Sequence, residues 1–205
     1  MSDALPGGPI LVWGAGAIGG TLGAALIRAG EEVVFVDVDA AHVAAINERG
    51  LDIVGPIDPH HVTAKAFLPD DVEGSFERIL LCVKAHHTEA ATAALLPHLS
   101  PGGYVLSAQN GLNERVIARQ TGEARVVGCF VNFGADYLEP GVVQYSGRAA
   151  VVVGEMDGRL SPRVTALHQA LLAFEPRAVL TRNISGYLFA KLVYGGLLFA
   201  TAVTD

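Results

Sequence analysis

The sequence predicts an α/β protein built on a doubly wound, mostly parallel sheet of the Rossmann type. Three observations predict it: apolar strand-like runs alternate with helical patterns, a glycine-rich turn separates the first run from the first helical pattern, and an acidic residue closes the second run. Parallel strands need a crossover between them, so this alternation is typical of βαβ units.

The expected parallel strands are short runs rich in Val, Ile and Leu, at residues 10–13, 32–36, 79–83, 104–107 and 125–131. The helical patterns between them cover residues 17–29, 40–49, 88–99 and 112–119. Asp39 is a suitable N-cap, and Gly30 and Gly50 are suitable helix stops.

The other segments predict smaller additions to this sheet. Residues 51–54 and 62–66 are expected to form a short antiparallel excursion, and residues 142–145 and 149–153 resemble a hairpin divided by Ser146-Gly147. A helix at 162–172, a strand at 178–180 and an apolar helix at 187–203 complete the prediction.

Composition narrows the class of protein. The chain has 205 residues, of which 51% are hydrophobic and 17% charged, enough for one sizeable core and part of a second domain. A net charge of −7 without any run of Lys or Arg argues against a nucleic-acid surface. Cys82 and Cys129 lie in apolar runs and are expected to be buried thiols, and the N-terminus shows no basic, secretory pattern, so we expect a cytoplasmic protein.

The apolar stretch at residues 187–203 raises the question of a membrane span. It is short for a span and carries Lys191, so a buried helix is favoured and no membrane partner is expected. A helix that is apolar on every face must be covered. We therefore expect its partners in further sequence beyond Asp205 or in a second copy of the chain, which would make a homodimer.

The glycine-rich turn reads Gly14-Ala15-Gly16-Ala17-Ile18-Gly19. In a dinucleotide site, Gly14 makes the tight turn, Gly16 lets the backbone approach a pyrophosphate, and Gly19 lets the helix pack closely on the sheet. The amides of Ala17 and Ile18 belong to the helix N-terminus that favours the phosphate charge. The alternative is a glycine turn that serves packing alone.

Asp37 ends the second strand at the spacing expected for an acid that binds the adenosine ribose. A carboxylate there accepts hydrogen bonds from ribose hydroxyls and repels a 2′-phosphate, which favours NAD(H) over NADP(H). Two alternatives stay open: Asp39 could cap the following helix, and Arg28 or Arg49 could fold back towards a phosphate.

Two further positions fall where the strands end. Lys84 follows the strand at 79–83 and could reach a phosphate or a substrate carboxylate, while Asn110 follows the strand at 104–107 and could contact the nicotinamide. The plain alternatives are a solvated lysine and an Asx turn before Gly111.

Lys191 is the remaining candidate, because a lysine in an apolar helix either extends to the surface or is held inside for a purpose. Burial lowers a lysine pKa towards the range of a useful general acid. Gly195 and Gly196 follow one turn later, which suggests a close approach to that helix. His60-His61 and His86-His87 have no spaced partners, so no metal site is expected.

Taken together and in this order, these motifs resemble the ketopantoate reductase (2-dehydropantoate 2-reductase) family. The resemblance rests on residues 14–19, 83–85, 109–111, 128–134 and 141–147 and on Asn183-Ile184 leading into Lys191-Leu192. It implies a Rossmann domain followed by an all-helical C-terminal domain, with substrate between them. Residues 1–181 would form the first domain and residues 182–205 the first helix of the second.

The resemblance also implies roles. Lys191 resembles the family's proton donor, Asn110 the residue that contacts cofactor and substrate, and Lys84 the lysine beside the cofactor. Gly134 falls near a backbone contact to the cofactor. The implied reaction is hydride transfer from a nicotinamide to the carbonyl of a 2-oxo acid, as in pantothenate biosynthesis.

The sequence departs from the family pattern at Gly195 and Phe199, where the family commonly carries asparagines. A bulkier or more apolar 2-oxo acid is therefore as good a candidate substrate as ketopantoate. Many family members use NADPH, whereas Asp37 indicates NADH. Two alternatives remain for the function: a regulatory module that senses NAD without turnover, and an inert fragment of the reductase.

Overall fold

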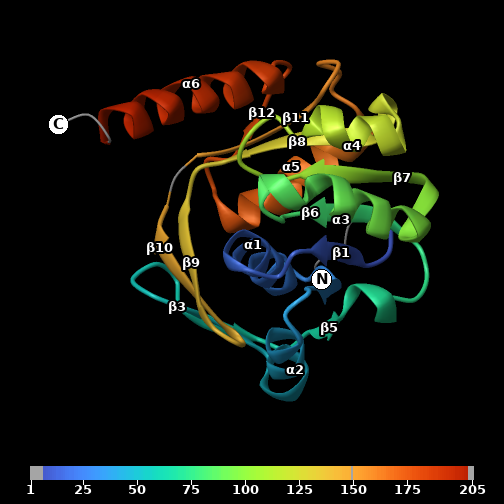
Figure 1. The fold of residues 1–205 in the computed structure, drawn as a ribbon, viewed down its shortest axis with the longest axis vertical. Helices are drawn as coiled ribbons and strands as arrows, with labels where there is room; N and C mark the ends of the chain where they lie inside the picture. The colour runs from blue at the N-terminus through green and yellow to red at the C-terminus, as the bar shows by residue number, and fades with distance from the viewer. Residues whose placement is uncertain (1–6, 149, 203–205) are drawn as a thin grey trace.

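The computed structural model describes residues 7–148 and 150–202, which form two sheets with helices packed around them (Figure 1). The larger sheet has eight strands in the order β12-β11-β8-β7-β6-β1-β2-β5. Their bounds are β1 (Ile10–Trp13), β2 (Val33–Val36), β5 (Lys65–Phe67), β6 (Phe76–Leu81), β7 (Leu99–Ser107), β8 (Val126–Val131), β11 (Val151–Glu155) and β12 (Val179–Leu180).

Six of these strands are parallel and confirm the predicted Rossmann-type topology. The run β5-β2-β1-β6-β7-β8 has parallel pairing throughout, and β11 joins its edge antiparallel to β8. The strand order reverses between β1 and β6, so their carboxyl ends flank the switch point where open α/β sheets bind ligands.

The helices cover both faces of the larger sheet. They are α1 (Ala17–Arg28), α2 (Ala40–Arg49), α3 (Thr88–Leu95), α4 (Glu114–Thr121), α5 (Pro162–Phe174) and α6 (Ile184–Ala202). Side chains of β1 alternate between faces: Ile10 and Val12 join the core under α1 and α5, whereas Leu11 and Trp13 join the core under α3 and α4. Two buried layers therefore enclose the parallel strands.

The smaller sheet packs against α1 and has the order β4-β3-β10-β9. Its strands are β3 (Leu51–Val54), β4 (His60–Val62), β9 (Gly134–Glu139) and β10 (Val142–Gly147). The antiparallel pairing of β3 with β4 confirms part of the predicted excursion. The predicted strand at 62–66 is nevertheless wrong in extent, because residues 65–67 belong to β5, the parallel edge strand beside β2.

The predicted hairpin of residues 142–145 with 149–153 is wrong. β10 pairs antiparallel with β9 across a turn at Gly141, and parallel with β3, whereas β11 pairs with β8 in the other sheet. The physical reason is that β9 supplies the partner of β10, so the chain leaves the smaller sheet at residue 148. Ala149 of the predicted hairpin lies outside the described residues.

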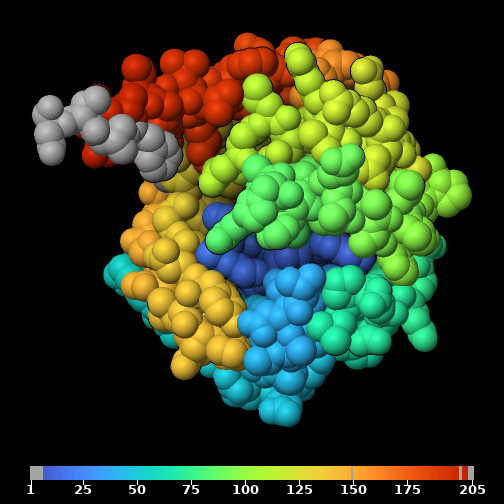
Figure 2. All heavy atoms as spheres, viewed as in Figure 1, coloured from blue at the N-terminus to red at the C-terminus, as the bar shows by residue number. Residues whose placement is uncertain are grey.

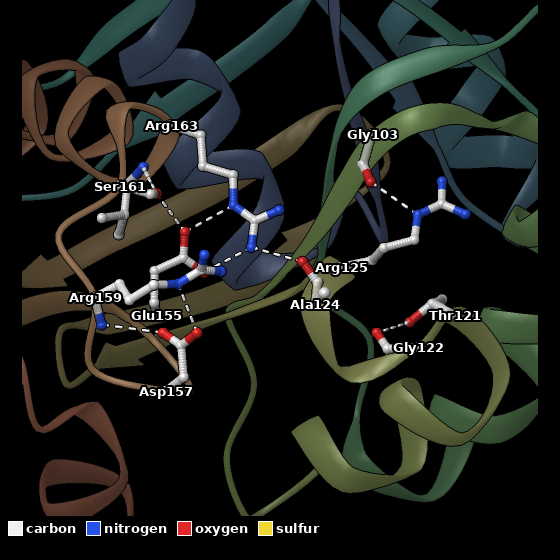
Figure 3. Close-up of polar contacts among 11 residues, drawn as sticks. Gly103, Thr121, Gly122, Ala124, Arg125, Glu155, Asp157, Arg159, Ser161 and Arg163 are labelled. Carbon is white, nitrogen blue, oxygen red and sulfur yellow. Dashed lines mark hydrogen bonds and ion pairs between the residues drawn. The ribbon is translucent and has the colours of Figure 1, made fainter.

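A buried ion pair fixes β11 in the larger sheet. The Glu155 carboxylate is 2% exposed and accepts two hydrogen bonds from Arg163, at 2.7 Å from Nε and 2.6 Å from Nη2, and one from Ser161 Oγ at 2.5 Å (Figure 3). Arg163 also donates to the Ala124 carbonyl at 2.9 Å. A bidentate pair that satisfies a buried carboxylate ties the end of β11 to the start of α5.

The two cysteines are free, and they differ in burial. Cys129 in β8 is buried, as predicted, and burial raises the pKa of its thiol to about 12. Cys82 is only partly buried, because it follows the last residue of β6 at the ligand edge of the sheet.

The last helix, α6, is covered only near its start. Ile184 and Leu188 are buried against β8 and β11, but further apolar side chains are exposed: Tyr187, Phe189, Leu192, Val193, Tyr194, Leu197 and Leu198. The expected buried helix is therefore not buried by the described part of this chain. By length and composition alone, α6 could cross a membrane, a test that core helices of soluble proteins also meet.

Candidate functional site at the carboxyl edge of the sheet

The predicted site residues lie at one edge of the larger sheet. Asp37, Gly14, Lys84 and Asn110 follow β2, β1, β6 and β7, and these four strands are consecutive neighbours. The surface is hollowed there: the blue atoms of the N-terminal segment lie deep between green, light-blue and orange parts of the chain (Figure 2). The topology thus brings together residues that are far apart in sequence.

The glycine turn has the backbone geometry that its three glycines permit. Gly14 has φ +98°, a left-handed conformation that side chains disfavour. A Cβ built on Gly19 would lie 1.8 Å from the Gly14 carbonyl oxygen, so only glycine lets α1 approach β1 here. A Cβ on Gly16 would meet no heavy atom of the described chain within 4 Å, so this position opens outward.

These features fit a pyrophosphate group at the start of α1. Gly16 is the N-cap, and no side chain of the described residues caps the helix there. The first-turn amides of Ala17, Ile18 and Gly19 precede the first intrahelical bond, which Gly20 donates to the Gly16 carbonyl at 2.7 Å. The first turn of α1 contains no acidic residue, so its amides favour an anion.

Asp37 has a structural contact in addition to its predicted role. Its Oδ2 accepts a hydrogen bond from the Ala15 amide at 2.8 Å, and its Oδ1 accepts one from the Asp39 amide at 3.0 Å. Asp39 caps α2 by accepting hydrogen bonds from the amides of Ala41 and His42, which is the N-cap role expected for it as an alternative. The Asp37 carboxylate therefore holds the glycine turn from the neighbouring strand.

The two arginines that could have approached a phosphate are engaged elsewhere. Arg28 forms an ion pair with Asp58 at 2.5 Å, and Arg49 donates to the Pro140 carbonyl. Neither hydrogen bond involves the glycine turn.

A buried glutamine organises the edge between Lys84 and Asn110. Gln109 is 4% exposed and donates to the Val83 carbonyl at 2.7 Å and to Thr88 Oγ1 at 2.9 Å. It thereby fixes the chain on both sides of Lys84, whose own side chain is exposed. Gln109 was not among the predicted site residues, although its place directly after a buried strand was a usable signal.

Lys191 and Asn110 meet across 81 positions of sequence. Lys191 Nζ donates a hydrogen bond to Asn110 Oδ1 at 2.7 Å and a second one to the Val131 carbonyl at the end of β8. The ammonium also lies 5.2 Å from the centre of the Phe130 ring. Burial lowers the pKa of Lys191 below its ordinary value. The arrangement presents a partly desolvated proton donor beside an amide.

A second contact holds α6 near the same strand end. Tyr194 Oη donates to Asn132 Oδ1 at 2.8 Å, a contact that no sequence signal identified. Gly195 follows, and a Cβ there would meet nothing of the described chain within 4 Å. Gly134 is exposed at the start of β9, where a Cβ would lie 2.7 Å from Ser146 Oγ. Gly134 and Gly195 therefore carry no side chain that would cover their own backbone.

Comparisons with known proteins identify the family and the fold. The model of the family described as ketopantoate reductase PanE/ApbA matches residues 10–158. A 2-dehydropantoate 2-reductase of Pyrococcus abyssi is 33% identical over 187 residues, which cover 90% of this chain and 60% of the relative. This chain therefore spans about 60% of that relative's length.

Solved structures show the same fold. The 2-dehydropantoate 2-reductase from Geobacter metallireducens is 26% identical with a TM-score of 0.83, over 91% of this chain and 62% of that one. A PanE/ApbA family ketopantoate reductase from Ralstonia eutropha is 29% identical with a TM-score of 0.79, over 90% of this chain and 60% of that one. The motif order, the fold and the family match all agree, and this chain belongs to the ketopantoate reductase family.

Proposed function

We propose that this chain binds NAD(H) at the β1–α1 turn and carries the proton donor for reduction of a 2-oxo acid to the 2-hydroxy acid. The observation that carries the proposal is the hydrogen bond from Lys191 Nζ to Asn110 Oδ1, which joins α6 to the ligand edge of the Rossmann sheet. The names of the relatives, 2-dehydropantoate 2-reductases, support this reaction class.

Each predicted residue has a part in this proposal. The backbone from Gly14 to Gly19 would hold the pyrophosphate, and Asp37 the adenosine ribose. Lys84 follows β6, which flanks the switch point, and its exposed side chain would contact polar groups of the cofactor. Gly134 would offer backbone to the cofactor from the start of β9.

The chemistry divides between cofactor and chain. When bound, a reduced nicotinamide would supply a hydride for the carbonyl carbon of the substrate. Lys191 donates a proton to the carbonyl oxygen as the C=O π pair moves onto it, and the neutral amine then regains its proton from water. Asn110 positions that ammonium, and the lowered pKa of Lys191 makes the proton easier to give than that of a surface lysine.

The preference for NAD(H) rests on the charges near Asp37. Its carboxylate is followed by Asp39, and Val38 between them is 81% exposed. A 2′-phosphate would meet two carboxylates, and Arg28 and Arg49 are bonded away from the turn. We therefore propose NAD(H) as the preferred cofactor. Gly195 removes an expected polar contact with the substrate, so its acyl group is to be identified with a panel of 2-oxo acids.

We also propose that the exposed side of α6 packs against protein, either the helical domain that the family resemblance implies or a second copy of this chain. Lys191 and Tyr194 both form hydrogen bonds with residues at the end of β8, and these bonds hold the helix to the larger sheet. That contact favours a protein-packing helix over a membrane span.

The test measures NADH and NADPH binding by the 205-residue chain, and oxidation of each with a panel of 2-oxo acids, for the parent and for Lys191→Met. Turnover that the variant loses while it still binds NADH supports the reductase. Binding without turnover in the parent favours the alternative of a sensing module or an inert fragment. Absence of binding contradicts the cofactor proposal itself.

A further inference from the structure

One histidine outside the predicted site contacts the glycine turn directly. His42 lies in the first turn of α2 and is fully buried. Its Nε2 lies 3.0 Å from the carbonyl oxygen of Ala15, the second residue of the glycine motif. Its Nδ1 accepts a hydrogen bond from the Gly141 amide at 2.9 Å, in the turn between β9 and β10.

These two contacts determine the protonation of the ring. The Gly141 amide can only donate, so Nδ1 must be the unprotonated nitrogen. The Ala15 carbonyl can only accept, so Nε2 must carry the proton. His42 is therefore a neutral Nε2–H imidazole that bridges the glycine turn and the smaller sheet.

The Ala15 peptide groups are held from two sides. The Ala15 amide donates to Asp37 Oδ2 at 2.8 Å, and its carbonyl accepts from His42. Ala15 itself is fully buried, so water does not replace either partner. The position of the turn that follows, Gly16 to Gly19, therefore depends on both side chains.

The ring has little freedom to move. Tyr137 of β9 packs its ring edge-on against His42, with centroids 5.0 Å apart, and its hydroxyl donates to Asp39 Oδ2 at 2.9 Å. Asp39 in turn accepts from the His42 amide at 3.3 Å. Tyr137 of the smaller sheet thus restrains the His42 ring, which in turn holds the Ala15 carbonyl.

We propose that His42 is a positioning residue for the dinucleotide, which sets the Ala15 carbonyl and thereby the amides that hold the pyrophosphate. This inference rests on the proposed binding of NAD(H) at the turn. It also assigns a second role to the smaller sheet: through Gly141 and His42, that sheet would fix the geometry of the glycine turn in the larger sheet.

Two conservative variants separate the two contacts. The amide nitrogen of Gln can occupy the place of Nε2, so His42→Gln keeps the donor to Ala15 and loses the acceptor for Gly141. The amide oxygen of Asn can occupy the place of Nδ1, so His42→Asn does the reverse. A matched control is His168→Asn, because His168 of α5 has its Nε2 2.9 Å from the Ala178 carbonyl, an acceptor outside the glycine turn.

The experiment is fluorescence titration of the full chain with NADH, together with thermal unfolding of each variant. We expect His42→Asn to weaken NADH binding by roughly 5- to 30-fold, the range for losing one buried hydrogen bond. His42→Gln should stay within about threefold and His168→Asn should bind as the parent does, while all three melt lower. Equal NADH affinity for His42→Asn and His42→Gln would overturn the proposal.

A measurement on the parent protein covers the case in which the variants do not fold. Nitrogen-15 NMR of the imidazole should show the neutral Nε2–H tautomer at pH 7, and NADH should shift the Ala15 and Gly141 amides together. A protonated Nδ1, or an Ala15 amide that NADH leaves unchanged, would overturn the positioning role. A parent that binds neither NADH nor NADPH contradicts the proposed cofactor instead.

Discussion

Lys191 Nζ lies 2.7 Å from Asn110 Oδ1, so the first half of α6 and the loop that follows β7 share one hydrogen bond. The same ammonium bonds to the Val131 carbonyl, and both acceptors lie at the carboxyl edge of the sheet. A proton donor is thus held where a parallel sheet presents its ligands.

Replacing Lys191 should separate catalysis from cofactor binding. Lys191→Met keeps the apolar stem and removes the proton, so we expect turnover to fall by at least about 100-fold, the usual range for a general acid. NADH affinity should change by less than about threefold, because the glycine turn is untouched. Stopped-flow oxidation and fluorescence titration measure the two effects. Equal turnover in variant and parent would remove Lys191 as the acid.

The lowered pKa of Lys191 also predicts a pH dependence of stability. The folded protein releases this proton at a lower pH than the unfolded chain, whose value is near 10.5. Between those two values the unfolded chain binds more protons, so the folded state gains stability as the pH rises. Urea unfolding should be measured for the parent and for Lys191→Met at pH 7 and pH 10. The free energy of unfolding of the parent, relative to that of the variant, should be larger at pH 10 than at pH 7. If this relative free energy of unfolding were instead smaller at pH 10, folding would have raised the pKa of Lys191.

Substitutions of the turn glycines should differ in their effects on stability and on NADH binding. Gly19→Ala places a Cβ 1.8 Å from the Gly14 carbonyl, so the variant should unfold or lose several degrees of melting temperature. Gly16→Ala meets open space and should fold normally, yet bind NADH at least about tenfold more weakly, because the methyl group blocks the pyrophosphate. Gly102→Ala, also in open space but away from the turn, is the control for both. Normal NADH binding by Gly16→Ala would argue for a turn that serves packing alone.

Cofactor preference should change at Val38 more cleanly than at Asp37. Val38→Arg adds a cation at an 81% exposed position and leaves the Asp37 bond to Ala15 intact, so NADPH affinity should rise by about tenfold. Asp37→Ser removes the brace, so it should weaken NADH binding without creating a good NADPH site. Titration of both cofactors against both variants measures this. A parent that already prefers NADPH would contradict the assignment of Asp37.

The buried Gln109 gives a stability prediction. Gln109→Ala leaves the Val83 carbonyl without its donor and should lower the free energy of unfolding by about 1–3 kcal/mol. Gln120→Ala is the matched control, because Gln120 donates to the Glu89 carbonyl at an exposed site, and it should change stability by less than about 0.5 kcal/mol. Urea unfolding compares them, and similar losses would show that burial at Gln109 does not matter.

The parallel sheet and its ligand edge followed from local patterns. Each of its central strands contains a short apolar run. Gly14 and Asp37 stand directly after one and Asn110 three residues after another, so the βαβ rule placed them at one edge. The smaller sheet did not follow in the same way. β9 is mostly exposed and carries few β-branched residues, which left β10 without a visible partner and suggested the wrong hairpin. Contacts such as Gln109 with Val83, or His42 with Ala15, join residues far apart in the sequence, so the local pattern around either residue does not predict its partner.

Among the described residues of α6, only Ile184 and Leu188 are buried, so a tilt of the helix would pivot about that end. Lys191 lies three residues beyond Leu188, about 4.5 Å along the axis, whereas Ala202 lies about 21 Å away. A tilt of about 10° around the buried end would carry Ala202 through nearly 4 Å and Lys191 through less than 1 Å, by the same rise per residue. Such a tilt would therefore change the surroundings of the far end of α6 while Lys191 stays close to Asn110 and Val131.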